Sequence, residues 1–159
     1  MTLTPTKISQ DLYDQDLMLW YQETITRLKQ HDFNDLDIEN LIEEIESLAN
    51  RERRELKSRL FVLVCHYLKR LYVPSRQDYR GWDATIREQQ RQLRQILKDS
   101  PSLKNYAHAQ FPEIWTDALE EVNANYPNVA FPQAWSLTQT IEELVSPEFL
   151  VKLSQQKQS

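Results

Sequence analysis

The sequence predicts an all-α protein, a mostly antiparallel helical bundle of four main helices plus a short C-terminal helix. Apolar residues recur every three or four positions through most of the chain, which is the spacing of amphipathic helices. The 159 residues include one glycine, whereas the tight turns of a hairpin-rich β protein usually use several. Pro74, Pro101 and Pro127 lie between the periodic segments, where helix breakers belong.

The first half of the chain predicts two helices. One covers about residues 12–28, and the cap-forming and turn-forming residues 31–35 should then reverse the chain. The second segment, residues 37–72, contains neither glycine nor proline. Its apolar stripe changes direction across the polar residues 50–55. We expect either one long helix whose halves meet different neighbours or a break near that point.

Pro74 should end the second segment, and residues 75–81 are predicted to form a loop. A third helix is expected over about residues 82–98. Ser100 followed by Pro101 has the pattern of an N-cap with proline at the first helical position, so a fourth helix should begin there.

The apolar stripe of the fourth segment keeps its phase across Pro112, which favours one bent helix over two separate ones. A short helix should follow at about residues 138–145. Ser136 and Gln139 have capping-box spacing at its start.

We expect one helical domain over residues 11–150, with flexible tails at 1–10 and 151–159. Cys65 is the single cysteine, so no intramolecular disulfide is possible, and its apolar neighbours predict a buried, inert thiol. The longest apolar run, residues 60–65, is far shorter than the roughly 20 residues of a membrane span. We therefore expect a cytoplasmic protein with no membrane partner.

Charge is unevenly distributed along the chain. The formal balance is −8 over residues 1–50, +7 over residues 51–94 and −4 over residues 95–159. An arginine-rich face in residues 51–94 is what phosphate binding needs, which makes a nucleic-acid-associated regulator one hypothesis. The net charge of −5 and the glutamates between the arginines argue against it, and we expect no nucleic-acid partner.

His66 lies in the most apolar segment and shares a helical face with Arg70. A histidine there can carry protons or bind a metal. More often such a ring is partly buried and hydrogen-bonded to a neighbouring helix. Glu88 and Gln89 are its expected partners if the chain reverses near Pro74.

Glu43 and Glu46 complete a candidate polar cluster with His66 and Arg70. Helical bundles hold paired metals with glutamates and a Glu-x-x-His signature, but no glutamate precedes any histidine by three residues here. A metal-binding bundle or enzyme centred on His66, Glu43 and Glu46 is therefore an alternative hypothesis. We expect no cofactor and no resident metal.

A candidate surface lies around the end of the second segment, where Tyr72, Arg76, Tyr79 and Trp82 cluster. Aromatic residues with arginine are typical of binding surfaces. They are equally typical of packing at the end of a helical bundle, which is the interpretation we prefer.

Several segments, in this order and spacing, resemble one family. They are Tyr13-Asp14-x-Asp16-x-x-x-Trp20, Leu41-Ile42-Glu43-Glu44-Ile45-Glu46-Ser47-Leu48, His66-Tyr67-Leu68-Lys69, Trp82-x-x-x-Ile86, Pro101-Ser102-Leu103 and Phe131-Pro132. They are similar to the bacterial domain-of-unknown-function family twenty-nine, common in photosynthetic bacteria. The resemblance covers about Leu12 to Leu150. It implies an all-α fold and no particular activity, and Phe111-Pro112 departs from its pattern.

The sequence thus favours a non-catalytic interaction or accessory protein that self-associates or binds a protein partner. No catalytic arrangement of residues stands out from ordinary structural roles. Tyrosines and tryptophans are concentrated at expected helix ends and loops, where they favour contact with another protein surface.

Overall fold

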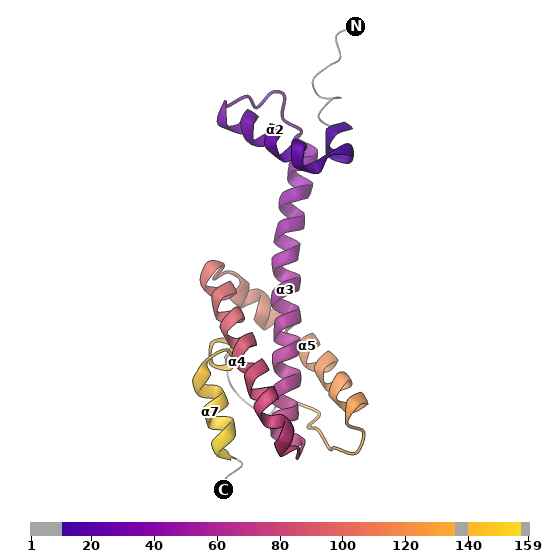
Figure 1. The fold of residues 1–159 in the computed structure, drawn as a ribbon, viewed down its shortest axis with the longest axis vertical. Coiled ribbons are helices and arrows are strands. Elements are labelled where there is room, and N and C mark those ends of the chain that lie inside the picture. Colours follow the sequence, from indigo (N-terminus) through magenta and orange to yellow (C-terminus); the bar gives the residue numbers. More distant parts are fainter. Residues whose placement is uncertain (1–10, 136–139, 157–159) are drawn as a thin grey trace. The chain divides into compact units, whose positions relative to one another are not determined.

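The computed structural model describes residues 11–135 and 140–156, and every regular element in these ranges is a helix (Figure 1). The prediction of an all-α protein is confirmed. The helices are α2 (Leu17–Lys29), α3 (Ile38–Tyr72), α4 (Arg76–Asp99), α5 (Leu103–Asn125), α6 (Ile141–Leu144) and α7 (Pro147–Gln156). The chain groups into two compact units that divide after Arg51.

The N-terminal unit contains α2 and the first part of α3. Residues 11–15 are helical, but α2 proper begins after Asp16, whose carboxylate accepts a hydrogen bond from the Leu19 amide at 3.0 Å. This N-cap divides the single helix expected over residues 12–28. His31, with φ of 58°, adopts the left-handed conformation that commonly ends a helix.

Helix α3 is one continuous helix from Ile38 to Tyr72. Of the two alternatives left open by the sequence, the long helix is observed, and there is no break at residues 50–55. Asp37 caps its start, because its carboxylate accepts from the Asn40 amide at 3.4 Å. Pro74 follows its end and cannot continue it.

The C-terminal unit packs the second part of α3 with α4, α5, α6 and α7. Helix α4 returns antiparallel to α3, since Arg59 contacts Gln89 at 3.2 Å and Arg70 contacts Asp83 at 2.8 Å. Helix α7 lies beside α4 (Figure 1). The most deeply buried side chains of the core are Leu56, Leu60, Leu63, Val64, Tyr67, Ile86, Leu93, Ala107 and Ala118.

Helix α4 begins at Arg76, six residues before the expected start, so the predicted loop over residues 75–81 is wrong. Gly81 suggested a break in the helix. At an exposed helical position, however, glycine costs only about 1 kcal/mol relative to alanine. No atom lies within 4 Å of the position of its missing Cβ, so close packing does not require glycine there.

Residues 101–102 form a turn. Helix α5 begins after it, at Leu103, with Ser102 as its N-cap residue. The predicted N-cap at Ser100 is therefore two residues early, about half a helical turn. The helix continues through Pro112 as one element, as the phase of its apolar stripe predicted.

The C-terminal end is more ordered than the sequence suggested. Helix α6 has a capping box formed by Thr140 and Glu143, whereas the predicted pair Ser136 and Gln139 lies outside the described residues. The flexible tail expected from residue 151 is wrong as far as Gln156, because α7 reaches that residue. Leu153 is only 2% exposed, and its burial holds this helix in place. Among the described residues, no helix has the length and apolar character needed to cross a membrane.

Candidate functional site

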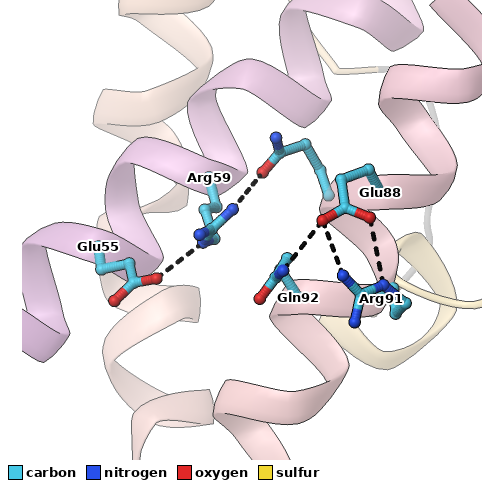
Figure 2. A network of polar contacts seen from close by, with 6 residues as sticks. Glu55, Arg59, Glu88, Arg91 and Gln92 are labelled. Atoms are coloured by element: carbon cyan, nitrogen blue, oxygen red, sulfur yellow. Dashed lines mark hydrogen bonds and ion pairs between the residues drawn. The ribbon is translucent and has the colours of Figure 1, made fainter.

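Several arginines of the arginine-rich face predicted in residues 51–94 contact acids, amides and carbonyls of the protein itself. Arg59 on α3 donates to Glu55 at 3.0 Å and to Gln89 on α4 at 3.2 Å (Figure 2). Arg91 donates to Glu88 at 2.8 Å. The same carboxylate accepts from Gln92, and these bonds lower the pKa of Glu88 (Figure 2). A phosphate backbone would have to compete with these contacts, and with the contact of Arg94 to the Val145 carbonyl at 2.6 Å.

His66 is half-buried and bonds within its own helix. Its Nδ1 lies 2.8 Å from the Val62 carbonyl and its Nε2 lies 3.3 Å from the Lys69 ammonium. Nδ1–H therefore donates to the carbonyl, and Nε2 accepts from the Lys69 ammonium. This pattern of one donor and one acceptor is that of a neutral imidazole ring. Burial lowers the pKa of His66, and the charge of Lys69 lowers it further.

The partners expected for His66 were wrong. Gln89 instead accepts from Arg59, and Glu88 pairs with Arg91. The ring lines a cavity of about 150 Å³ between α3 and α5, together with Cys65 and Lys69. Burial raises the pKa of the Cys65 thiol to about 11, so this thiol is a poor nucleophile.

The residues of the candidate polar cluster are divided between the two units. Glu43 and Glu46 are exposed on α3 in the N-terminal unit, whereas His66 and Arg70 belong to the C-terminal unit. Arg70 is buried, donating to Asp83 at 2.8 Å and stacking on Tyr79 at 4.0 Å. Within the described ranges, no group of three or more His, Cys, Asp and Glu residues is placed to hold a metal ion.

The candidate aromatic surface is mostly used for packing. Trp82 is only 9% exposed, and its ring contacts Tyr79 and Tyr126. The Tyr79 hydroxyl donates to the Val73 carbonyl at 3.2 Å. Tyr72 remains 37% exposed beside Phe131, and Arg76 is exposed. These contacts tie the end of α3 to the start of α4 and leave little aromatic surface open.

A groove of about 670 Å³ lies between α3 and α5 in the C-terminal unit. Phe61, Val62 and Ile114 line it with apolar surface. Lys57 on α3 forms an ion pair with Glu113 on α5 at 2.9 Å. This pair connects the two helices beside the groove. Basic side chains of α3 and acidic side chains of α5 line it as well, namely Arg54, Lys57, Asp117, Glu120 and Glu121.

The most unusual feature of the structure is the exposed apolar surface of the N-terminal unit. We define the N-terminal apolar face as the large apolar side chains of residues 17–48 that are 39–65% exposed. They are Leu17, Met18, Leu19, Ile25, Leu28, Phe33, Ile38, Ile42, Ile45 and Leu48. Elsewhere in the described chain, only Tyr72 and Val151 are exposed large apolar residues. Large exposed apolar side chains concentrated in one unit favour an interaction surface.

The core beneath this face is small. Trp20 and Leu36 are the buried apolar residues in the described part of the unit. Trp20 Nε1 donates to the Asp37 carboxylate at 3.2 Å. One polar contact between α3 and the preceding segment is made by Glu44, which accepts from the hydroxyls of Tyr13 and Tyr21.

The hydrogen bonds to Glu44 couple the ionisation of the three groups. They lower the pKa of the Glu44 carboxyl, and the bond to Glu44 raises the pKa of Tyr13 to about 12. The carboxylate is thus held charged while both tyrosines remain protonated donors. This cluster orients α2 against the start of α3.

Comparison with known proteins agrees with the helical architecture. The chain matches the family described as "Domain of unknown function DUF29" over residues 12–150. It belongs to that family. This DUF29 chain is similar to a crystal structure of an alpha-helical protein of unknown function from Rhodospirillum rubrum. The two share 21% sequence identity with a TM-score of 0.62, over 90% of this chain and 96% of the other. The similarity shows the fold alone, and no curated protein matches the chain.

Sequence reasoning missed the N-terminal apolar face of this DUF29 protein. The apolar periodicity of residues 37–72 predicts that Leu48 is buried in the core, but this side chain is 53% exposed. One signal was present: α2 carries Met18, Leu19 and Ile25 on more than one side. A single contact with one neighbouring helix cannot cover all of these directions.

Proposed function

We propose that this DUF29 protein is a non-catalytic interaction protein that self-associates through the N-terminal apolar face. The observation that carries the proposal is the contrast between that face and the small apolar core, Trp20 and Leu36, in the described part of the unit. Exposed apolar side chains in a solvated protein are stabilised when a second surface covers them.

The size of the unit supports the same proposal. The unit spans Met1–Arg51, which is little longer than the roughly 40 residues below which domains usually need disulfides, metals or oligomerisation. It contains no cysteine, so a disulfide cannot supply the missing stability. Association with another apolar surface would do so.

The free energy gained by covering the N-terminal apolar face is of the same order as the free-energy cost of association. Completing the burial of a half-exposed leucine or isoleucine stabilises by roughly 1 kcal/mol. Summed over the faces of two copies, this is comparable with the cost of association, about 4–15 kcal/mol. The face therefore favours a reversible self-association.

The proposed partners are a second copy of the chain or another protein, without nucleic acid or membrane. The support is that arginines of the basic stretch already contact acids and carbonyls of the chain (Figure 2). We also propose a cytoplasmic location, which the single buried thiol of Cys65 supports.

The test is the molar mass in solution by light scattering at several protein concentrations. We expect the unmodified protein to be at least dimeric. Ile42→Glu with Ile45→Glu places charges in the N-terminal apolar face and should give a monomer, because buried unpaired charges are strongly unfavourable.

The matched control is Val151→Glu. Val151 is 56% exposed on α7, so a glutamate again replaces an exposed β-branched apolar side chain, but on a different unit, and the dimer should persist. A monomeric unmodified protein at all concentrations would overturn the proposal. Equal loss of association in the control would remove the assignment to the N-terminal face.

A further inference from the structure

We propose that the first part of α3 pairs antiparallel with the same segment of a second copy, about a two-fold axis near residue 43. This inference rests on the proposed function and names its partner and geometry. It concerns only the N-terminal unit, and the contacting segment is residues 38–48.

The apolar residues of this segment have heptad spacing. Ile38 and Ile45 occupy a positions, and Leu41 and Leu48 occupy d positions. Helices that pair antiparallel bring a positions of one chain opposite d positions of the other. With the axis near residue 43, Ile38 lies opposite the second copy's Leu48. The same axis places Leu41 opposite the second copy's Ile45. A single register therefore matches every a position of the segment with a d position of the second copy.

The position of α2 favours an antiparallel pair. Helix α2 contacts α3 on its g side, through Asp37 and Glu44. The e side carries Ile42, which is 52% exposed. Antiparallel helices bring e sides together and g sides together, so the open sides of both copies meet at Ile42 and the α2 helices of both copies lie along the other side of the pair. A parallel pair would instead direct each e side at the partner's g side, which α2 already covers.

The charges agree with this arrangement. Glu39, Glu43 and Glu46 lie on the face of α3 that is opposite the a and d positions, so they remain solvated and do not meet across the pair. In the same register, the exposed Arg51 of one copy lies near Asp35 of the other. A parallel pair would instead place Arg51 at the level of the second copy's Arg51, and Asp35 at the level of the second copy's Asp35. Such pairs of like charges are unfavourable.

Cysteine cross-linking tests the register. All variants carry Cys65→Ala, which removes the native thiol. One chain carries Ile38→Cys and another carries Leu48→Cys. Each is oxidised alone and as an equimolar mixture, after circular dichroism has confirmed that it is folded. A disulfide requires Cα atoms about 4.4–6.8 Å apart, so it reports direct opposition.

We expect covalent dimers in the mixture at several times the yield found with either chain alone. Cross-linking of each chain with itself, without gain in the mixture, would overturn the antiparallel pairing in favour of a parallel one. If light scattering shows a dimer but neither the chains nor their mixture cross-link, the α3 seam is wrong while self-association stands. A monomer by light scattering would overturn the proposed function itself.

Discussion

His66 is an internally bonded histidine whose ionisation is coupled to folding. Its Nδ1–H bonds to the Val62 carbonyl, and Lys69 lies 3.3 Å from Nε2. Both the surrounding apolar side chains and this lysine disfavour the charged ring, which lowers the pKa of His66 below its ordinary value of 6.5. The unfolded chain therefore takes up a proton at a higher pH than the folded protein does.

This linkage predicts a loss of stability on mild acidification. The free energy of unfolding should be unaffected by His66 above pH 6.5 and should fall as the pH passes from 6.5 toward the lower folded pKa. The slope due to one group is at most about 1.4 kcal/mol per pH unit. Urea denaturation at pH 7.5 and 5.5 measures it.

His66→Gln removes this titration. At pH 7.5 we expect the variant to be about 1–3 kcal/mol less stable than the unmodified protein, the penalty for a disturbed buried hydrogen bond. At pH 5.5 this difference should shrink by on the order of 1 kcal/mol. His108→Gln, at an exposed position on α5, is the control. A constant difference at both pH values would contradict the coupling.

Among the elements, α6 depends on contacts with the rest of the C-terminal unit. It has four residues, and isolated helices shorter than about 12 residues are marginal in water. Tyr67 on α3 donates to the Leu144 carbonyl, and Gln90 on α4 donates to the Tyr67 hydroxyl at 2.8 Å. Gln90 also donates to the Ser146 carbonyl at 2.9 Å. These buried bonds hold α6 against α3 and α4.

Tyr67→Phe should therefore destabilise the protein by about 1–3 kcal/mol, because the buried Leu144 carbonyl loses the hydroxyl that donates to it. The change removes one oxygen and leaves the ring contact with Phe149 intact. Urea denaturation gives the free energy, and hydrogen exchange at α6 should increase.

Tyr72→Phe is the matched control at a 37% exposed position, and it should change stability by less than about 0.5 kcal/mol. If the two variants were equally stable, the Tyr67 hydroxyl would not be holding α6.

The sequence predicted elements well where one physical signal dominated. The absence of glycine and proline indicated α3, and the unbroken apolar stripe carried α5 through Pro112. It failed where local signals were weak or misleading. The segment 76–81 has a single large apolar residue, Tyr79, and ends in a glycine, so its helical state depends on packing of Tyr79 and Trp82. Helix α7 was missed because it is stabilised by packing against α4, a tertiary contact that local sequence patterns do not reveal.

The candidate site was harder to predict for a related reason. A helical stripe such as Ile38, Ile45 and Leu48 has the same spacing whether it faces its own chain or another surface. Periodicity therefore placed Leu48 in the core, and only the structure shows that it is exposed. The position of His66 in an apolar helix was clear from sequence, but its bond to Val62 on the same helix was not.

At the scale of the whole molecule, the two units differ in how they are stabilised. The C-terminal unit has an extensive apolar core, whereas the described N-terminal unit buries Trp20 and Leu36. If association covers the N-terminal apolar face, the stability of that unit depends on protein concentration through mass action. The stability of the C-terminal unit does not.

Thermal unfolding followed by circular dichroism should therefore show two transitions with different concentration dependence. Raising the concentration about 100-fold stabilises an associating unit by up to about 2.7 kcal/mol, so the transition of the N-terminal unit should move to higher temperature. The transition of the C-terminal unit should not move. In Ile42→Glu with Ile45→Glu, the first transition should occur at lower temperature and lose its concentration dependence. Two concentration-independent transitions in the unmodified protein would mean that folding of the N-terminal unit is not linked to association.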